Sequence, residues 1–126
     1  MCLSLVGADK KPLTKEESAK VIEAAIREQI RKPAGELTKA DLEKVKWLDL
    51  DGRFGEKIID VKGLEKLTQL NYLFLDGNQL TDVKGLEKLT QLTTLWLEGN
   101  PDLTKAQIAE LQKALPKCRI LSNAKK

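Results

Sequence analysis

The chain has 126 residues, of which 41% are hydrophobic, and this length and composition fit one small domain with a core of its own. Its 22 basic and 19 acidic residues leave a net charge of +3, which is too balanced to indicate a nucleic-acid partner. The sequence contains no histidine, the commonest acid–base catalyst and metal ligand, and no stretch approaches the roughly 20 apolar residues of a membrane span. We therefore expect a protein without a catalytic site, a metal, another cofactor or a membrane span.

Residues 1–13 allow two interpretations. The first eight residues are apolar and small, and Val6 and Ala8 occupy the −3 and −1 positions of a signal-peptidase site, but a basic leader is absent. The segment is therefore either the remnant of an export signal or a disordered start. The first interpretation slightly favours a secreted or cell-envelope location over a cytoplasmic one.

Residues 14–44 are predicted to form a helical N-terminal cap. Thr14 and Glu17 have the spacing of a capping box, and the segment Pro33–Gly35 is expected to end the helix. Four apolar residues between them recur three or four positions apart and form one stripe: Ala19, Ile22, Ile26 and Ile30. A second capping box, Thr38–Asp41, predicts a short helix through about residue 44.

The segment Asp60–Leu70 recurs letter for letter at Asp82–Leu92, 22 residues later. The pattern Leu-x-x-Leu-x-Leu-x-x-Asn runs from Leu70 to Asn78 and again from Leu92 to Asn100. A period of this length predicts a solenoid, in which one coil cannot bury its apolar side alone and must stack on the next.

These motifs resemble the bacterial leucine-rich repeat family, specifically its short 22-residue, internalin-like type with a helical N-cap. The resemblance implies a right-handed α/β solenoid with a parallel, concave sheet, and it implies protein recognition. We expect about four coils over residues 45–122, ending in a capping coil with a helix that starts at Thr104 and a final strand, and a frayed tail at 123–126. The predicted strands are Lys46–Asp51, Tyr72–Asp76, Thr94–Glu98 and Lys117–Leu121.

The resemblance also implies roles for residues at the turns. Asn78 and Asn100 fall where the family uses side-chain amides to hydrogen-bond turn backbone between coils. Arg53 takes this position in the first coil, so that turn must be satisfied in another way, and its longer loop is one candidate. Cys118 occupies an inward leucine position, which predicts a buried, unreactive thiol.

Side chains alternate along a strand, so inward leucines define an outward set on the other face of the sheet. Four of the five aromatic residues belong to this outward set, with Trp47 beside Tyr72 and Phe74 beside Trp96. Next to them, Asp51, Asp76 and Glu98 form an acidic column. The predicted partner-binding residues are Trp47, Asp49, Asp51, Tyr72, Phe74, Asp76, Thr94, Trp96, Glu98 and Arg119.

Several interpretations of this face remain open. The rings could be cross-strand ladders, each contributing about 0.2–1 kcal/mol to folding. Folding does not require large exposed rings, however, and contiguous apolar surface marks interaction sites, so we favour a non-catalytic module that binds a protein or peptide, with the carboxylates steering a basic partner. Carbohydrate or cell-envelope binding is the first alternative, and a homo-oligomer formed through the same face is the second. The carboxylates would lie on an open, wet surface, which argues against an enzyme.

Overall fold

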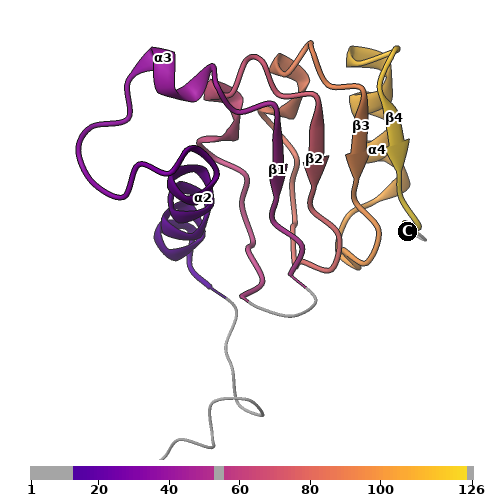
Figure 1. Cartoon of the computed structure of the whole chain (residues 1–126). Coiled ribbons are helices and arrows are strands. Elements are labelled where there is room, and N and C mark those ends of the chain that lie inside the picture. Colours follow the sequence, from indigo (N-terminus) through magenta and orange to yellow (C-terminus); the bar gives the residue numbers. More distant parts are fainter. Residues whose placement is uncertain (1–12, 53–55, 125–126) are drawn as a thin grey trace, which may run out of the picture.

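The computed structural model describes residues 13–52 and 56–124, and it shows an α/β leucine-rich-repeat fold (Figure 1). The predicted start or export remnant falls, apart from Leu13, outside the described residues. Within the described residues a sheet of four parallel strands has the order β1-β2-β3-β4. The strands are β1 (Trp47–Asp49), β2 (Tyr72–Phe74), β3 (Thr94–Trp96) and β4 (Arg119–Leu121), and the other elements are α2 (Lys15–Ile30), α3 (Lys39–Leu42), η1 (Leu64–Lys66), η2 (Leu86–Lys88) and α4 (Lys105–Ala114).

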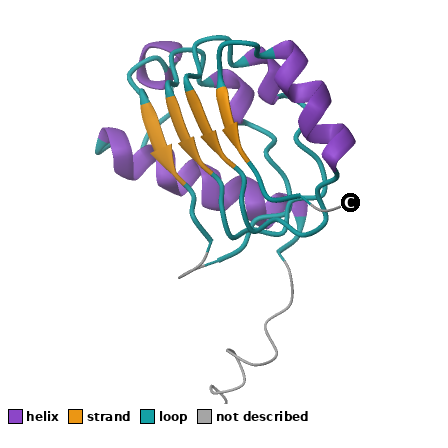
Figure 2. Cartoon of the chain, turned by 90° about the vertical axis from the view of Figure 1, so that its right-hand side faces the viewer, coloured by secondary structure: helices purple, strands orange, loops and turns teal. Residues whose placement is uncertain are grey.

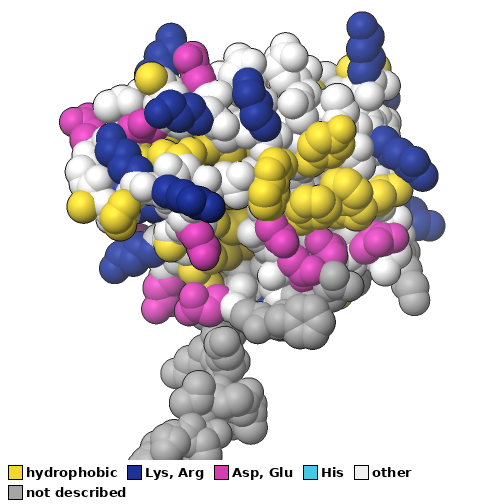
Figure 3. All heavy atoms as spheres, in the orientation of Figure 1, with side chains coloured by type: hydrophobic (Ala, Val, Ile, Leu, Met, Phe, Trp, Pro, Cys, Tyr) yellow, Lys and Arg dark blue, Asp and Glu magenta, His cyan; other side chains and the backbone are white. Residues whose placement is uncertain are grey.

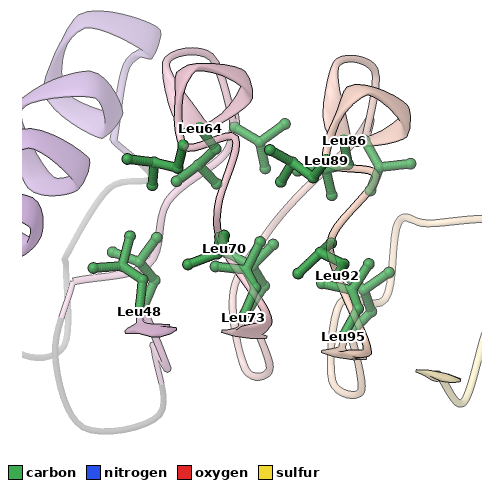
Figure 4. Close-up of a cluster of buried hydrophobic side chains, with 14 of the residues drawn as sticks. Leu48, Leu64, Leu70, Leu73, Leu86, Leu89, Leu92 and Leu95 are labelled. Atoms are coloured by element: carbon green, nitrogen blue, oxygen red, sulfur yellow. The ribbon is translucent and has the colours of Figure 1, made fainter. Parts of the chain in front are cut away.

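The helical elements leave one face of the sheet open (Figure 2). The 3₁₀ turns η1 and η2 pack against each other, and α4 packs against η2, so these elements form the layer behind the sheet. Leucines from the strands and from the 3₁₀ turns meet between the two layers, where Leu48, Leu73 and Leu95 repeat from coil to coil (Figure 4). Each buried leucine contributes on the order of 1.5–3 kcal/mol, so this ladder dominates folding. The predicted inward register is therefore confirmed.

Two buried asparagines join neighbouring coils. The side-chain amide of Asn78 donates to the carbonyls of Leu50 and Leu75, 2.8 and 3.0 Å away, and its Oδ1 accepts the N–H of Ile58 at 2.9 Å. Asn100 repeats this arrangement one coil later, with the carbonyls of Leu75 and Leu97 and the N–H of Leu80. Each asparagine thus serves its own coil and the coil before it.

This arrangement explains why the first coil can lack an asparagine. Asn78 satisfies Leu50 and Ile58 of the first coil from the second coil. The longer loop contributes as well, because Lys57 donates from Nζ to the carbonyls of Gly52 and Gly77, both at 3.1 Å. Arg53 itself lies outside the described residues. Because the helices α2 and α3 rather than another coil precede β1, no earlier coil in the described part of the chain needs an amide from that position.

Helix α2 packs on the first coil through a stripe that differs from the predicted one. Its Thr14–Glu17 capping box is present, but Ser18, Ile22 and Ile26 are buried, whereas Ala19 is exposed. The helix is rotated so that Ser18 faces the coil, where its Oγ accepts the N–H of Ile59 at 3.0 Å. A small hydroxyl side chain fills this position because it satisfies a backbone donor that alanine would leave unpaired.

Helix α2 ends earlier than the segment Pro33–Gly35 predicts. Arg31 follows its last residue in a left-handed conformation (φ 59°), and its N–H donates to Glu28 O, while Lys32 N–H donates to Arg27 O. Lys32 then pairs with Asp41 of α3, with 2.6 Å between Nζ and Oδ2. The Lys32 ammonium and the Thr38 backbone hydrogen bond hold the pKa of Asp41 far below its ordinary value of 3.8.

The C-terminal coil replaces a 3₁₀ turn with α4, which follows Thr104 as predicted and begins with a Thr104–Gln107 capping box. Cys118 is buried and free, as predicted, and burial raises the pKa of its thiol.

Beyond the strands, Gly77 N–H donates to Glu98 O in the next coil, and Gly99 N–H donates to Oδ1 of Asn123, the first residue of the predicted tail. The Asn123 side chain therefore takes the place that a backbone carbonyl of the next coil holds in the preceding turn.

Candidate functional site

The open face of the sheet, called here the outer sheet face, carries its side chains in two rows set by the strand register. The first row places Trp47, Tyr72, Thr94 and Arg119 side by side on β1 to β4, and the second places Asp49, Phe74, Trp96 and Leu121 side by side. The predicted neighbours Trp47–Tyr72 and Phe74–Trp96 are therefore confirmed. Parallel pairing of stacked coils produces this alignment, because each strand repeats the inward and outward alternation of the one before.

The four rings on this face, called here the aromatic platform, are Trp47, Tyr72, Phe74 and Trp96. Phe74 and Trp96 stack with their ring centroids 4.3 Å apart and an angle of 24° between their planes. This stack leaves both rings half-buried, whereas Trp47 and Tyr72 are 46% and 47% exposed. The expectation of four exposed rings is therefore wrong for the central pair, because each of its rings shields the other.

Acidic side chains follow the strands along one edge of the platform (Figure 3). The ladder hydrogen bonds continue past the strand ends, from Gly52 N–H to Asp76 O and from Gly77 N–H to Glu98 O, at 3.0 and 2.8 Å. This continuation carries the register on to Asp51, Asp76 and Glu98, called here the acidic row. Asp49 adds a carboxylate within the platform's second row, where its Oδ1 accepts the N–H of Asp51.

All ten predicted residues lie along the outer sheet face, but they do not form one compact cluster. Arg119 lies beside Thr94 on β4, at the opposite end of the first row from Trp47. Three strand spacings separate these ends, which is roughly 14 Å. The ten residues are therefore spread along the face from β1 to β4.

The sequence does not predict a hollow that lies where α2 meets β1. It has a volume of about 530 Å³, and its lining residues are Ala25, Glu28, Gln29, Trp47, Leu48, Asp49 and Asp51. The helical period does place Ala25 and Gln29 beside the buried Ile26, but nothing in the sequence states which strand that side of the helix approaches. Glu28 and Gln29 thus join the candidate site as residues that sequence reasoning missed.

Other kinds of site find no support in the described residues. Residues 13–52 and 56–124 contain no group of three His, Cys, Asp or Glu side chains placed to hold a metal ion. The same ranges contain no helix that is long and apolar enough to cross a membrane.

A family model for leucine-rich repeats, described as two copies, matches residues 68–113. The structure of an internalin (inlF) from Listeria monocytogenes superposes with a TM-score of 0.69 and 29% identity, over 84% of this chain and 31% of the internalin. The chain is a bacterial, internalin-like leucine-rich repeat protein.

A leucine-rich repeat protein from Leptospira interrogans is also similar to this internalin-like chain, with a TM-score of 0.55 and 33% identity, over 67% of this chain and 21% of that protein. The internalin-like chain thus spans less than a third of either solved relative. A search of curated protein sequences finds no match.

Proposed function

We propose that this internalin-like chain is a non-catalytic module that binds a protein or peptide segment on its outer sheet face. The observation that carries the proposal is the aromatic platform, in which two exposed rings, Trp47 and Tyr72, adjoin the stacked pair Phe74–Trp96 on rigid, register-aligned strands. Tryptophan and tyrosine dominate binding hot spots because they bury large areas at a low cost in side-chain entropy. The leucine-rich-repeat family and the internalin-like fold support the same conclusion.

The charges beside the platform favour a basic partner. The acidic row and Asp49 place four carboxylates next to the rings, and complementary charge raises association rates and excludes acidic competitors. A protein or peptide fits the platform better than a sugar does. Sugars stack on open ring faces, whereas Phe74 and Trp96 cover part of each other's faces.

Peptide selection followed by substitution tests the proposed function. Peptides selected from a random library on the folded protein should bind saturably, and Trp47→Ala or Tyr72→Ala should weaken them at least tenfold by isothermal titration calorimetry. Both side chains lie on the open face of the sheet and outside the hydrophobic core, so circular dichroism should show a fold like that of the unsubstituted protein.

The matched control is Thr90→Ala, an exposed substitution outside the outer sheet face, which should leave affinity unchanged. Equal affinity of the selected peptides for the Tyr72→Ala variant and the parent would overturn the proposal. Saturable binding on a glycan array would instead support carbohydrate binding by this face. A dimer in sedimentation velocity that Tyr72→Ala dissociates would instead support homo-oligomerisation through it.

A further inference from the structure

The hollow between α2 and β1 adjoins the aromatic platform at its N-terminal end. Trp47 belongs to both, because it begins the first row of the outer sheet face and also lines the hollow. On the other side the hollow is bounded by Ala25, Glu28 and Gln29, near the end of α2. A segment bound on the platform therefore has this hollow directly beside it.

The hollow has a strongly negative lining. Glu28, Asp49 and Asp51 contribute carboxylates, and no lysine or arginine is among the described residues that line it. Of the basic residues near the end of α2, Arg27 pairs with Glu23 at 2.8 Å and Lys32 pairs with Asp41, while Arg31 follows the helix as an exposed residue that is not among those lining the hollow. The carbonyl end of α2 adds a partial negative charge near Glu28.

We propose that this hollow receives an arginine side chain of the bound segment, an inference that rests on the proposed function. The guanidinium group lies against the exposed indole of Trp47 and donates to the carboxylates of Glu28 and Asp49. Arginine fits better than lysine because its planar group stacks on an indole and donates in a fixed fork to carboxylates. The platform binds the apolar part of the segment, and the hollow determines where a basic residue must stand.

Nuclear magnetic resonance with a single-residue probe tests the hollow apart from the platform. N-acetyl-arginine methylamide, titrated to millimolar concentration, should shift the Trp47 indole N–H and the Gln29 side-chain amide signals saturably. N-acetyl-citrulline methylamide has nearly the same shape without the charge and should leave these signals in place. Similar shifts with both compounds, or none with either, would show that the hollow does not recognise a guanidinium group.

Two charge-neutralising substitutions make the test specific. Glu28→Gln and Asp49→Asn should each weaken binding of the arginine compound at least fivefold, and folding is monitored by the dispersion of the backbone amide signals. Glu110→Gln on α4 removes the same charge from an exposed position on another element and should change the affinity by less than twofold. Equal effects of Glu28→Gln and Glu110→Gln would mean that only the overall charge of the chain matters.

The outcomes separate this inference from the proposed function. If selected peptides require Tyr72 but bind equally well when their arginine becomes citrulline, the hollow is not the arginine site while the platform still binds peptides. If the arginine compound binds in the hollow but no peptide depends on Tyr72, the hollow recognises a guanidinium group while the proposed peptide-binding function fails.

Discussion

At the scale of single residues, Asn78 and Asn100 connect the coils more directly than any other polar side chain in the described ranges. Each is almost fully buried and uses both ends of its amide. Its Nδ2 donates to two buried backbone carbonyls, and its Oδ1 accepts one backbone N–H. Leucines at the same sites could fill the volume but would leave these backbone groups unpaired away from water.

We expect Asn78→Ala to lower the free energy of unfolding by about 2–4 kcal/mol in urea, because the Leu50 carbonyl and the Ile58 N–H lose the partner that Asn78 gives them, whereas the Leu75 carbonyl keeps Asn100. Asn71→Ala is the matched control, since the Asn71 side chain makes no hydrogen bond within the described ranges, and it should stay within about 0.5 kcal/mol of the parent. A cost for Asn78→Ala no larger than that of Asn71→Ala would contradict the assigned role of the amide.

At the scale of elements, the ion pair between Lys32 and Asp41 fixes α3 against the residues that follow α2. Lys32 Nζ also donates to Glu36 O at 2.7 Å, and Asp41 Oδ2 also accepts the N–H of Thr38, so the pair closes the loop between the helices. Ser18 connects α2 to the first coil in a comparable way, through the N–H of Ile59.

The pH dependence of stability should report on this loop. The Lys32 ammonium lowers the folded-state pKa of Asp41 below its unfolded value of 3.8, so the pair stabilises the fold above about pH 4, and its contribution is lost as the pH falls toward the folded-state value. In urea unfolding followed from pH 7 to pH 2.5, Asp41→Asn should be less stable than the parent at pH 7, and the difference should shrink in acid. A difference that stays constant with pH would show that the carboxylate charge of Asp41 is irrelevant.

At the scale of the whole molecule, one hydrophobic cluster runs from α2 through the coils to α4. The two tryptophans lie on β1 and β3 and so report on different coils. We expect the single-tryptophan variants Trp47→Phe and Trp96→Phe to show, each by fluorescence, the same urea midpoint that circular dichroism shows for the same variant, because a chain of so few coils unfolds as one unit. Separate midpoints within one variant would mean that the coil holding the remaining tryptophan, the third or the first, unfolds independently of the rest.

Much of this fold could be predicted from the sequence because aligning the copies of a repeat shows which residues of successive strands lie side by side. Once Leu70–Asn78 and Leu92–Asn100 are aligned, the inward leucines, the glycine turns and the paired rings follow from strand alternation. The helix capping boxes were equally readable, since Thr14, Thr38 and Thr104 each stand three residues before a side chain that can accept from the cap backbone.

Features that depend on how separate elements meet could not be predicted in this way. Ser18 looks like a surface residue in a helical pattern, and only the docking of α2 on the first coil shows that its hydroxyl serves Ile59. The left-handed Arg31 carries no glycine signal. The stacking that half-buries Phe74 and Trp96, and the hollow that brings Glu28 to Trp47, both arise from distances in space that a sequence period does not encode.

The direction of the asparagine hydrogen bonds has a consequence for how the chain is made. Leu50 and Ile58 obtain their partner from a residue 20 or more positions later, so a nascent chain leaving the ribosome cannot complete its first turn until Asn78 has emerged. The same delay repeats for Leu80 with Asn100. In both cases the buried hydrogen bonds of one coil form only after the asparagine of the next coil has been synthesised.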